Sequence, residues 1–217
     1  MRTLPLNIRD WLQLWIDGSN NGSTTYYDVS GNGRDGTAIA MTQTRILQHK
    51  KMSFSWSWYI NLPTTMASSL WTSFTWSWWI KAKETSGTYY IWSLYNQGDS
   101  PEIRIYISAN TLNFYLYDWW GYQCQLSTAY TSTNWNYITI IATTNSFIMY
   151  INWVAVTSDT SWSFNIDWAT IHSIWYYWIN WTTQAQKFNW DITNVMIWNR
   201  ALSATEVQQL HKAQYIK

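Results

Sequence analysis

The sequence predicts an all-β fold, a two-sheet antiparallel jelly-roll sandwich with one short C-terminal helix. Apolar and polar residues alternate with a period of two in several segments, which is typical of strands that bury one face. Turn residues separate these segments, and helical spacing occurs in the last segment of the chain. The 217 residues suffice for one sizeable core, so we expect a single domain over residues 1–217 with a core of about 12–213.

The clearest strand is 103–107, in which three isoleucines share one face while Arg104 and Tyr106 take the other. The alternation resumes after a turn at 108–111, so 112–117 completes a hairpin. The same pattern predicts a second hairpin, 137–142 with 147–151, and two further strands at 154–157 and 192–198.

The last segment predicts the helix. Ser203 and Glu206 have the spacing of a capping box, in which Ser203 is the N-cap and Glu206 reaches back to it. Val207, Leu210 and Ala213 then form a short apolar stripe at helical spacing.

Composition limits the classes of partner. Charged residues make up 12% of the chain and the formal net charge is +1, so we expect neither nucleic acid nor an acidic membrane as partner. No stretch approaches 18 uninterrupted apolar residues, and we expect no membrane insertion. The N-terminus lacks the apolar run of a signal peptide. Cys124 has no partner for an internal disulfide, and we expect it to be a small buried hydrophobe.

Tryptophan is abundant and glycine scarce, with 20 and 8 residues respectively, although an average protein has about 7% glycine. The shortage matters because turns use glycine to reach positive φ without strain. Many tryptophans directly follow Asn, Asp or Ser, where turn glycines are common. These are Trp11, Trp56, Trp58, Trp78, Trp119, Trp135, Trp153, Trp162, Trp168, Trp181 and Trp190.

The clearest example is Asn152-Trp153, the two residues that link 147–151 to 154–157. A two-residue type I′ turn requires positive φ at both positions, which a bulky residue reaches at a cost of about 1–2 kcal/mol. We therefore put forward the hypothesis that many of these positions are glycine in the functional protein. Some bacteria and their phages read UGA as glycine, and reading that codon as tryptophan would produce this pattern. The alternative is a surface truly rich in tryptophan for stacking on sugars.

Four segments, in order, carry a family resemblance. They are 12–18 with the Gly-rich loop 28–37, then 54–63 with 73–81, then 134–154, and last 188–203 followed by the helix. Together they resemble the laminin G-like jelly-roll modules of the concanavalin A-like lectin/glucanase superfamily, over residues 12 to about 213. Trp56, Trp153 and Trp190 stand where that family has glycine, whereas Trp15, Trp79, Trp135 and Trp198 stand where it has tryptophan or another aromatic residue. The resemblance therefore implies that these last four are core tryptophans.

Catalysis is not expected. The glucanases of this superfamily carry paired carboxylates on one strand, because glycoside hydrolysis needs an acid and a nucleophile at the same bond. None of Glu84, Glu102 and Glu206 has another carboxylate at that spacing, and Asp99 and Glu102 flank a proline in a loop. The histidines are scattered, and we expect His49 and His211 on the solvated surface.

A calcium ion is the one cofactor that the sequence suggests. Asp28, Asn32 and Asp35 offer hard oxygen ligands within one Gly-rich turn, and modules related by the resemblance often carry a structural Ca²⁺. The alternative is that Asp28 and Asn32 accept hydrogen bonds from their own backbone in Asx-turns.

Two loops carry residue types suited to sugar recognition, which needs a ring for stacking and planar amide or carboxylate groups for hydroxyls. Tyr117, Asp118 and Tyr122 lie at one turn, and Asn96, Gln97 and Asp99 at another. The alternative is that both are ordinary surface turns.

The function expected from the resemblance and these loops is that of a non-catalytic, carbohydrate-binding, lectin-like module of a virion or cell-surface protein. Its partner would be a glycan or a surface protein, and its location extracellular, at a cell surface or on a virion. The alternatives are a protein-interaction or structural assembly module of the same fold without a sugar site, and, against the carboxylate spacing, a glycoside hydrolase.

Overall fold

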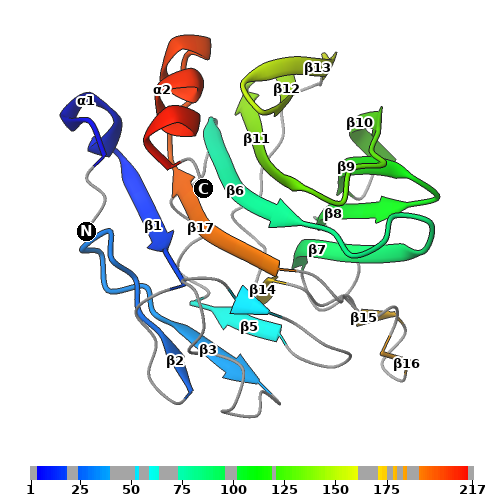
Figure 1. Cartoon of the computed structure of the whole chain (residues 1–217), viewed down its shortest axis with the longest axis horizontal. Helices are drawn as coiled ribbons and strands as arrows, with labels where there is room; N and C mark the ends of the chain where they lie inside the picture. Colours follow the sequence, from blue (N-terminus) through cyan, green and yellow to red (C-terminus); the bar gives the residue numbers. More distant parts are fainter. Residues whose placement is uncertain are drawn as a thin grey trace.

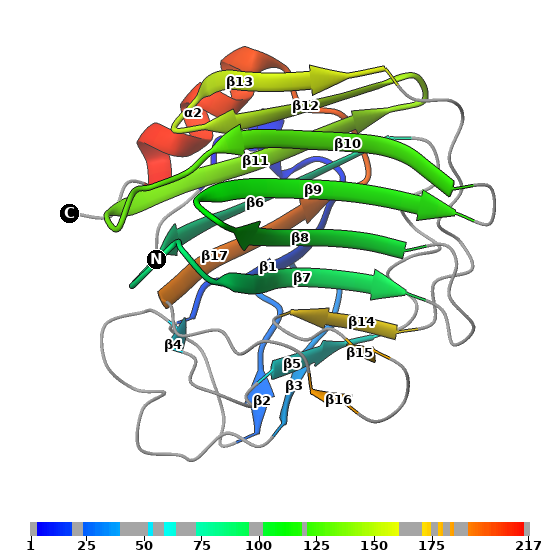
Figure 2. The ribbon, with the colours of Figure 1, turned by 90° about the vertical axis from the view of Figure 1, so that its right-hand side faces the viewer.

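The structure is a computed structural model that describes most of the chain. The described residues are 4–18, 24–39, 52–53, 59–63, 73–95, 102–118, 121–160, 171–174, 178–179, 183–184 and 191–214. Within them, strands pair antiparallel in two large sheets that pack face to face (Figure 1, Figure 2). The all-β jelly-roll prediction is confirmed.

The first sheet has seven strands. Its order is β1 (Leu12–Ile16), β17 (Asp191–Trp198), β6 (Phe74–Lys81), β11 (Trp135–Thr143), β12 (Ser146–Ile151) and β13 (Val154–Asp159), with β4 (Met52–Ser53) paired to β17. The two ends of the chain thus meet in one sheet, because β1 pairs with β17.

The second sheet has eight strands. Its order is β10 (Gly121–Ala129), β9 (Thr111–Asp118), β8 (Glu102–Ser108), β7 (Thr88–Tyr95), β14 (Ile171–Ile174), β5 (Tyr59–Leu62), β3 (Gly36–Ile39) and β2 (Thr25–Tyr26). A separate pair is formed by β15 (Trp178–Ile179) and β16 (Thr183–Gln184). The edges β10 and β13 meet where the backbone N–H of Gln125 donates to Asp159 at 3.0 Å.

The main core lies between the sheets, and period-two alternation creates it. Ile103, Ile105 and Ile107 of β8 point inward and are fully buried. The alternate residues of β9, which are Leu112, Phe114 and Leu116, are buried in the same core. Both predicted hairpins are present, β8 with β9 and β11 with β12. The predicted strands at 154–157 and 192–198 correspond to β13 and β17.

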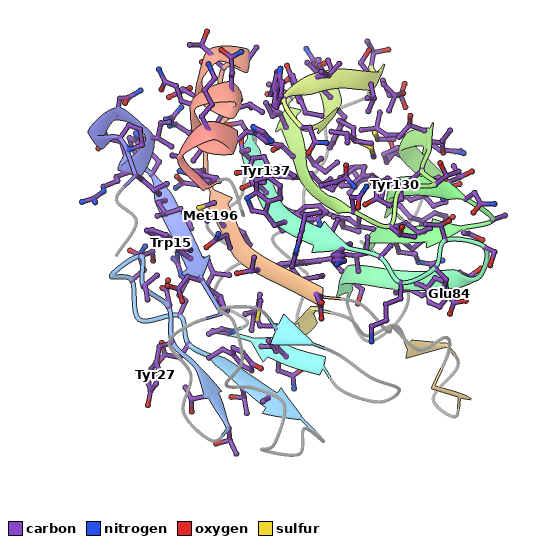
Figure 3. The ribbon with its side chains drawn as sticks, viewed as in Figure 1. Trp15, Tyr27, Glu84, Tyr130, Tyr137 and Met196 are labelled. Atoms are coloured by element: carbon purple, nitrogen blue, oxygen red, sulfur yellow. The ribbon has the colours of Figure 1, made fainter. Side chains whose placement is uncertain are left out.

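A second core lies on the outer side of the seven-stranded sheet, beneath the helices α1 (Leu6–Arg9) and α2 (Ala204–Gln214). It contains Trp15 of β1, Tyr137 of β11 and Met196 of β17, which are labelled in Figure 3. As a consequence β6 and β17 are buried along both faces and do not alternate in exposure. In the part of the chain that the structure describes, neither helix has the length and apolar character to cross a bilayer.

The start of α2 confirms the capping box. The carboxylate of Glu206 accepts a hydrogen bond from the backbone N–H of Ser203 at 2.8 Å, and the N–H of Glu206 donates to the Ser203 hydroxyl at 3.3 Å. Arg200 adds a two-pronged ion pair to the same carboxylate, at 3.0 Å and 2.6 Å. These bonds hold the pKa of Glu206 down to about 2.

The expectation for His211 is wrong. The side chain is 4% exposed and packs against the rings of Trp79, Tyr137 and Trp153, with centroids 5.2, 6.0 and 4.3 Å away. The physical reason is helical spacing: His211 lies four residues after Val207, on the face of α2 that meets the sheet. Burial lowers the pKa of this imidazole.

Candidate functional site

The outer side of strands β7 to β10 is uncovered by described helices or strands, whereas the outer side of the seven-stranded sheet lies beneath α1 and α2. In Figure 2 these four strands face the viewer and no described helix or strand lies in front of them. Because alternate residues of β8 and β9 point into the core, the residues between them point outward. The surface chemistry here is therefore set by every second residue of four neighbouring strands.

Tyrosines form a row across this surface. The ring of Tyr106 lies 5.2 Å from that of Tyr90 on β7 and 5.4 Å from that of Tyr115 on β9. Tyr90 is buried at one end, whereas Tyr106 and Tyr115 are partly exposed. Such tilted and edge-on contacts hold aromatic rings in fixed orientations. The row thus presents preordered apolar rings.

Polar groups lie in register with the rings. Arg104 of β8 is the cross-strand partner of Tyr115, and Gln125 of β10 is its partner on the other side. The Gln125 amide donates to the Tyr115 hydroxyl at 3.0 Å. In the next row the Ser127 hydroxyl donates to the Asn113 side chain at 2.8 Å. We call the surface made by Tyr90, Arg104, Tyr106, Tyr115, Tyr117 and Gln125 the tyrosine face.

One predicted ligand loop adjoins this face. Tyr117 is partly exposed on β9 and pairs with Tyr122 across the β9–β10 turn, and Asp118 pairs with Gly121. The side chains of Asp118 and Tyr122 lie outside the described residues, so their roles stay predictions.

The second predicted loop, with Asn96, Gln97 and Asp99, lies outside the described residues altogether. Its flanking strands are informative, because Glu102 at the start of β8 pairs with Tyr117 near the end of β9. The start of β8 therefore lies at the same end of the sheet as the end of β9 and the start of β10.

Sequence reasoning missed Tyr90, Tyr106, Tyr115, Arg104 and Gln125 as a site. The signal was present for β8 and β9, where alternation already placed Arg104 and Tyr106 on the face opposite the isoleucines. What the sequence lacked was the lateral order of strands, which adds Tyr90 from β7 and Gln125 from β10.

The Gly-rich loop is organised by Asp28. One carboxylate oxygen accepts from the backbone N–H groups of Trp15 and Ser30, both at 2.9 Å. The other accepts from the Ser30 hydroxyl at 2.8 Å and the Arg34 N–H at 3.1 Å. The bond from Ser30 N–H is the Asx-turn contact.

Asn32 and Asp35 take part in the same loop. The Asn32 amide donates to the Leu12 carbonyl at 2.7 Å, and Asp35 accepts from the Asp28 N–H at 2.8 Å. An ion at Asp28 would have to displace N–H and O–H donors that already point at both oxygens. Within the described residues no cluster of three or more His, Cys, Asp or Glu side chains could hold a metal. The calcium site stays a prediction.

Cys124 is buried against the main core, as expected, and burial raises the pKa of its thiol. A thiol in this position is protonated at neutral pH and inert as a nucleophile.

A laminin G family model, described as the concanavalin A-like lectin/glucanases superfamily, matches residues 55–208. The chain belongs to this superfamily. No curated protein matches it by sequence.

Solved structures with the same fold include binding domains of botulinum neurotoxins. One is the binding domain of neurotoxin DC in complex with rat synaptotagmin II, and another is neurotoxin type C, whose cell entry depends on two ganglioside molecules. Each has a TM-score of 0.78 and 18% identity, and covers 96% of this chain and 53% of its own. A third, neurotoxin DC in complex with SialylT, has a TM-score of 0.75 at 17% identity. This chain thus spans about half the length of those proteins, and the likeness is one of fold.

Proposed function

We propose that this chain is a non-catalytic, carbohydrate-binding, lectin-like module of an extracellular, cell-surface or virion protein. The observation that carries the proposal is the tyrosine face. Its partly exposed rings at Tyr106 and Tyr115 are held in place by their neighbours, and Arg104 and Gln125 lie directly beside them.

The chemistry of this face suits a sugar. The C–H side of a pyranose packs on an aromatic ring, and its hydroxyls need donors and acceptors in a plane beside that ring. Arg104 brings a guanidinium with donors alone, while the Gln125 amide and the tyrosine hydroxyls both donate and accept. Because these rings and the Gln125 amide lie on paired strands, they lose little conformational entropy when a ligand binds to the tyrosine face.

Binding suits this face better than hydrolysis. Glycoside cleavage needs two carboxyl groups on either side of the bond. The described outward side chains of strands β8 to β10 include an arginine, tyrosines, amides and hydroxyls, and none of them is a carboxylate. Neighbours of the same fold are named for binding gangliosides, a sialyl compound or synaptotagmin, which supports a glycan or surface protein as partner here.

The second candidate is a protein-interaction or assembly module of the same fold. Edge strand β13 favours it, since Val154 is 55% exposed and Val156 also lies at the surface. Exposed apolar side chains on an edge strand can contact a protein partner.

The test is a glycan array probed with purified protein, once with Ca²⁺ and once with EDTA. We expect binding to a defined sugar class, and loss in EDTA would support an ion near the Asp28 loop. A blank array from a sample that is folded by circular dichroism would contradict the lectin proposal and favour the assembly module.

A further inference from the structure

Two tryptophans have a backbone that disfavours their own side chain. Trp11 and Trp153 have φ of 67° and 65°, in the left-handed region where the Cβ of an L-residue is strained. They are also the most exposed tryptophans among the described residues, at 65% and 43%. Strain is thus not offset there by deep burial of the indole.

The turn at residue 153 leaves no other conformation. Ile151 pairs with Val154, so Asn152 and Trp153 form a two-residue hairpin loop, and Asn152 too has a positive φ of 48°. Asn152 is clamped to β11, because its side-chain oxygen accepts from the N–H of Tyr137 and its own N–H donates to the Tyr137 carbonyl, both at 2.8 Å. This is the type I′ geometry, for which Asn-Gly is the preferred pair.

The position of residue 11 is fixed in the same way. It follows the C-cap of α1, Asp10, where left-handed glycine commonly ends a helix. Its carbonyl accepts from the N–H of Asn199 at 3.1 Å, and the next residue pairs with Trp198 of β17. The left-handed backbone is therefore required by the entry of the chain into β1.

Two other tryptophans have surroundings that suit an indole. Trp15 and Trp198 are buried in the second core and lie in strands. Their indole N–H groups donate to the Asn194 side chain at 3.5 Å and to the Ile8 carbonyl at 2.6 Å. Backbone conformation, burial and hydrogen bonding thus distinguish Trp15 and Trp198 from Trp11 and Trp153.

We propose that positions 11 and 153 are glycine in the cell that makes this protein, encoded by UGA, whereas positions 15 and 198 are tryptophan encoded by UGG. The backbone at 11 and 153 requires what glycine supplies. A consequence, which rests on the proposed function, is that the two exposed indoles are not sugar-stacking rings. Among the described residues of strands β8 to β10, the partly exposed rings that could stack on a glycan are those of Tyr106, Tyr115 and Tyr117.

The test is to read the four codons in the gene and to sequence the protein from its natural source by mass spectrometry. We expect UGA at 11 and 153 with glycine in the peptides, and UGG at 15 and 198 with tryptophan. UGG at 11 or 153, tryptophan in either peptide, or the same codon at all four positions would overturn the proposal. The result is independent of glycan binding, so it stands or falls apart from the proposed function.

Discussion

The turn at residue 153 allows a thermodynamic test in which sign matters more than size. Trp153→Gly and Trp153→Ala both remove the ring that lies 4.3 Å from His211, so the loss of that contact cancels between them. They differ in the Cβ, which at φ 65° costs about 1–2 kcal/mol. The glycine variant loses about 0.4–1 kcal/mol of this advantage, because glycine raises the conformational entropy of the unfolded chain.

We therefore expect Trp153→Gly to be about 1 kcal/mol more stable than Trp153→Ala, or about 2–4 °C in Tm for a domain of this size. Urea and thermal unfolding followed by circular dichroism would measure it.

A matched pair at Trp135 provides the control, since this residue lies in strand β11 and has no left-handed backbone. There the order should reverse, with alanine above glycine by about 0.5–1 kcal/mol. An alanine variant at 153 that is as stable as the glycine variant would refute the reasoning.

Three further outcomes follow from the structure. Glu206→Gln should lower the free energy of unfolding by about 1 kcal/mol in urea at pH 7, because it weakens both the cap of α2 and the ion pair with Arg200. Since the pKa of Glu206 is about 2 in the folded chain, its carboxylate contributes its full stabilisation above pH about 4.5 and loses it as the pH falls toward 2. Burial lowers the pKa of His211 in the folded state, so the free energy of unfolding should fall as the pH decreases below about 6.5. The His211→Gln variant should lose less stability over the same pH range. An equal loss of stability with pH in both proteins would contradict this prediction. Since Asp28 is satisfied by N–H and O–H donors, EDTA should leave the melting temperature unchanged, and a clear drop would establish a bound ion.

Features set by local chemistry were predictable from the sequence. The alternation at 103–107 predicted which residues of β8 are buried, and Ser203 with Glu206 predicted the start of α2. Asn152-Trp153 predicted a turn with positive φ at both residues. In each case the information lies within a few neighbouring residues, where sterics and hydrogen bonding decide the conformation.

Features set by long-range packing were not predictable. His211 was expected at the surface, because the sequence does not show that Trp79 and Tyr137 of the seven-stranded sheet lie beneath its face of α2. The tyrosine face was missed for the same reason, since Tyr90 and Gln125 join Tyr106 and Tyr115 through the order of four strands. The predicted ligand residues lie in loops, whereas the rings of the tyrosine face lie at regular positions of strands β7 to β9.

The central claim is that the tyrosine face binds a glycan, and paired tyrosine variants test it most directly. Tyr106→Ala removes the central ring of the row, whereas Tyr27→Ala removes a 42% exposed tyrosine that Figure 3 places well away from β7 to β10. Loss of a stacking ring costs about 1–2 kcal/mol, which is about tenfold in Kd.

The measurement is titration calorimetry of both variants, and of the unchanged chain, with a sugar that the array identifies. We predict about tenfold weaker binding for Tyr106→Ala, near-unchanged binding for Tyr27→Ala, and recovery in Tyr106→Phe, which keeps the ring. Unchanged affinity in a folded Tyr106→Ala variant would contradict the assignment of this face as the binding site.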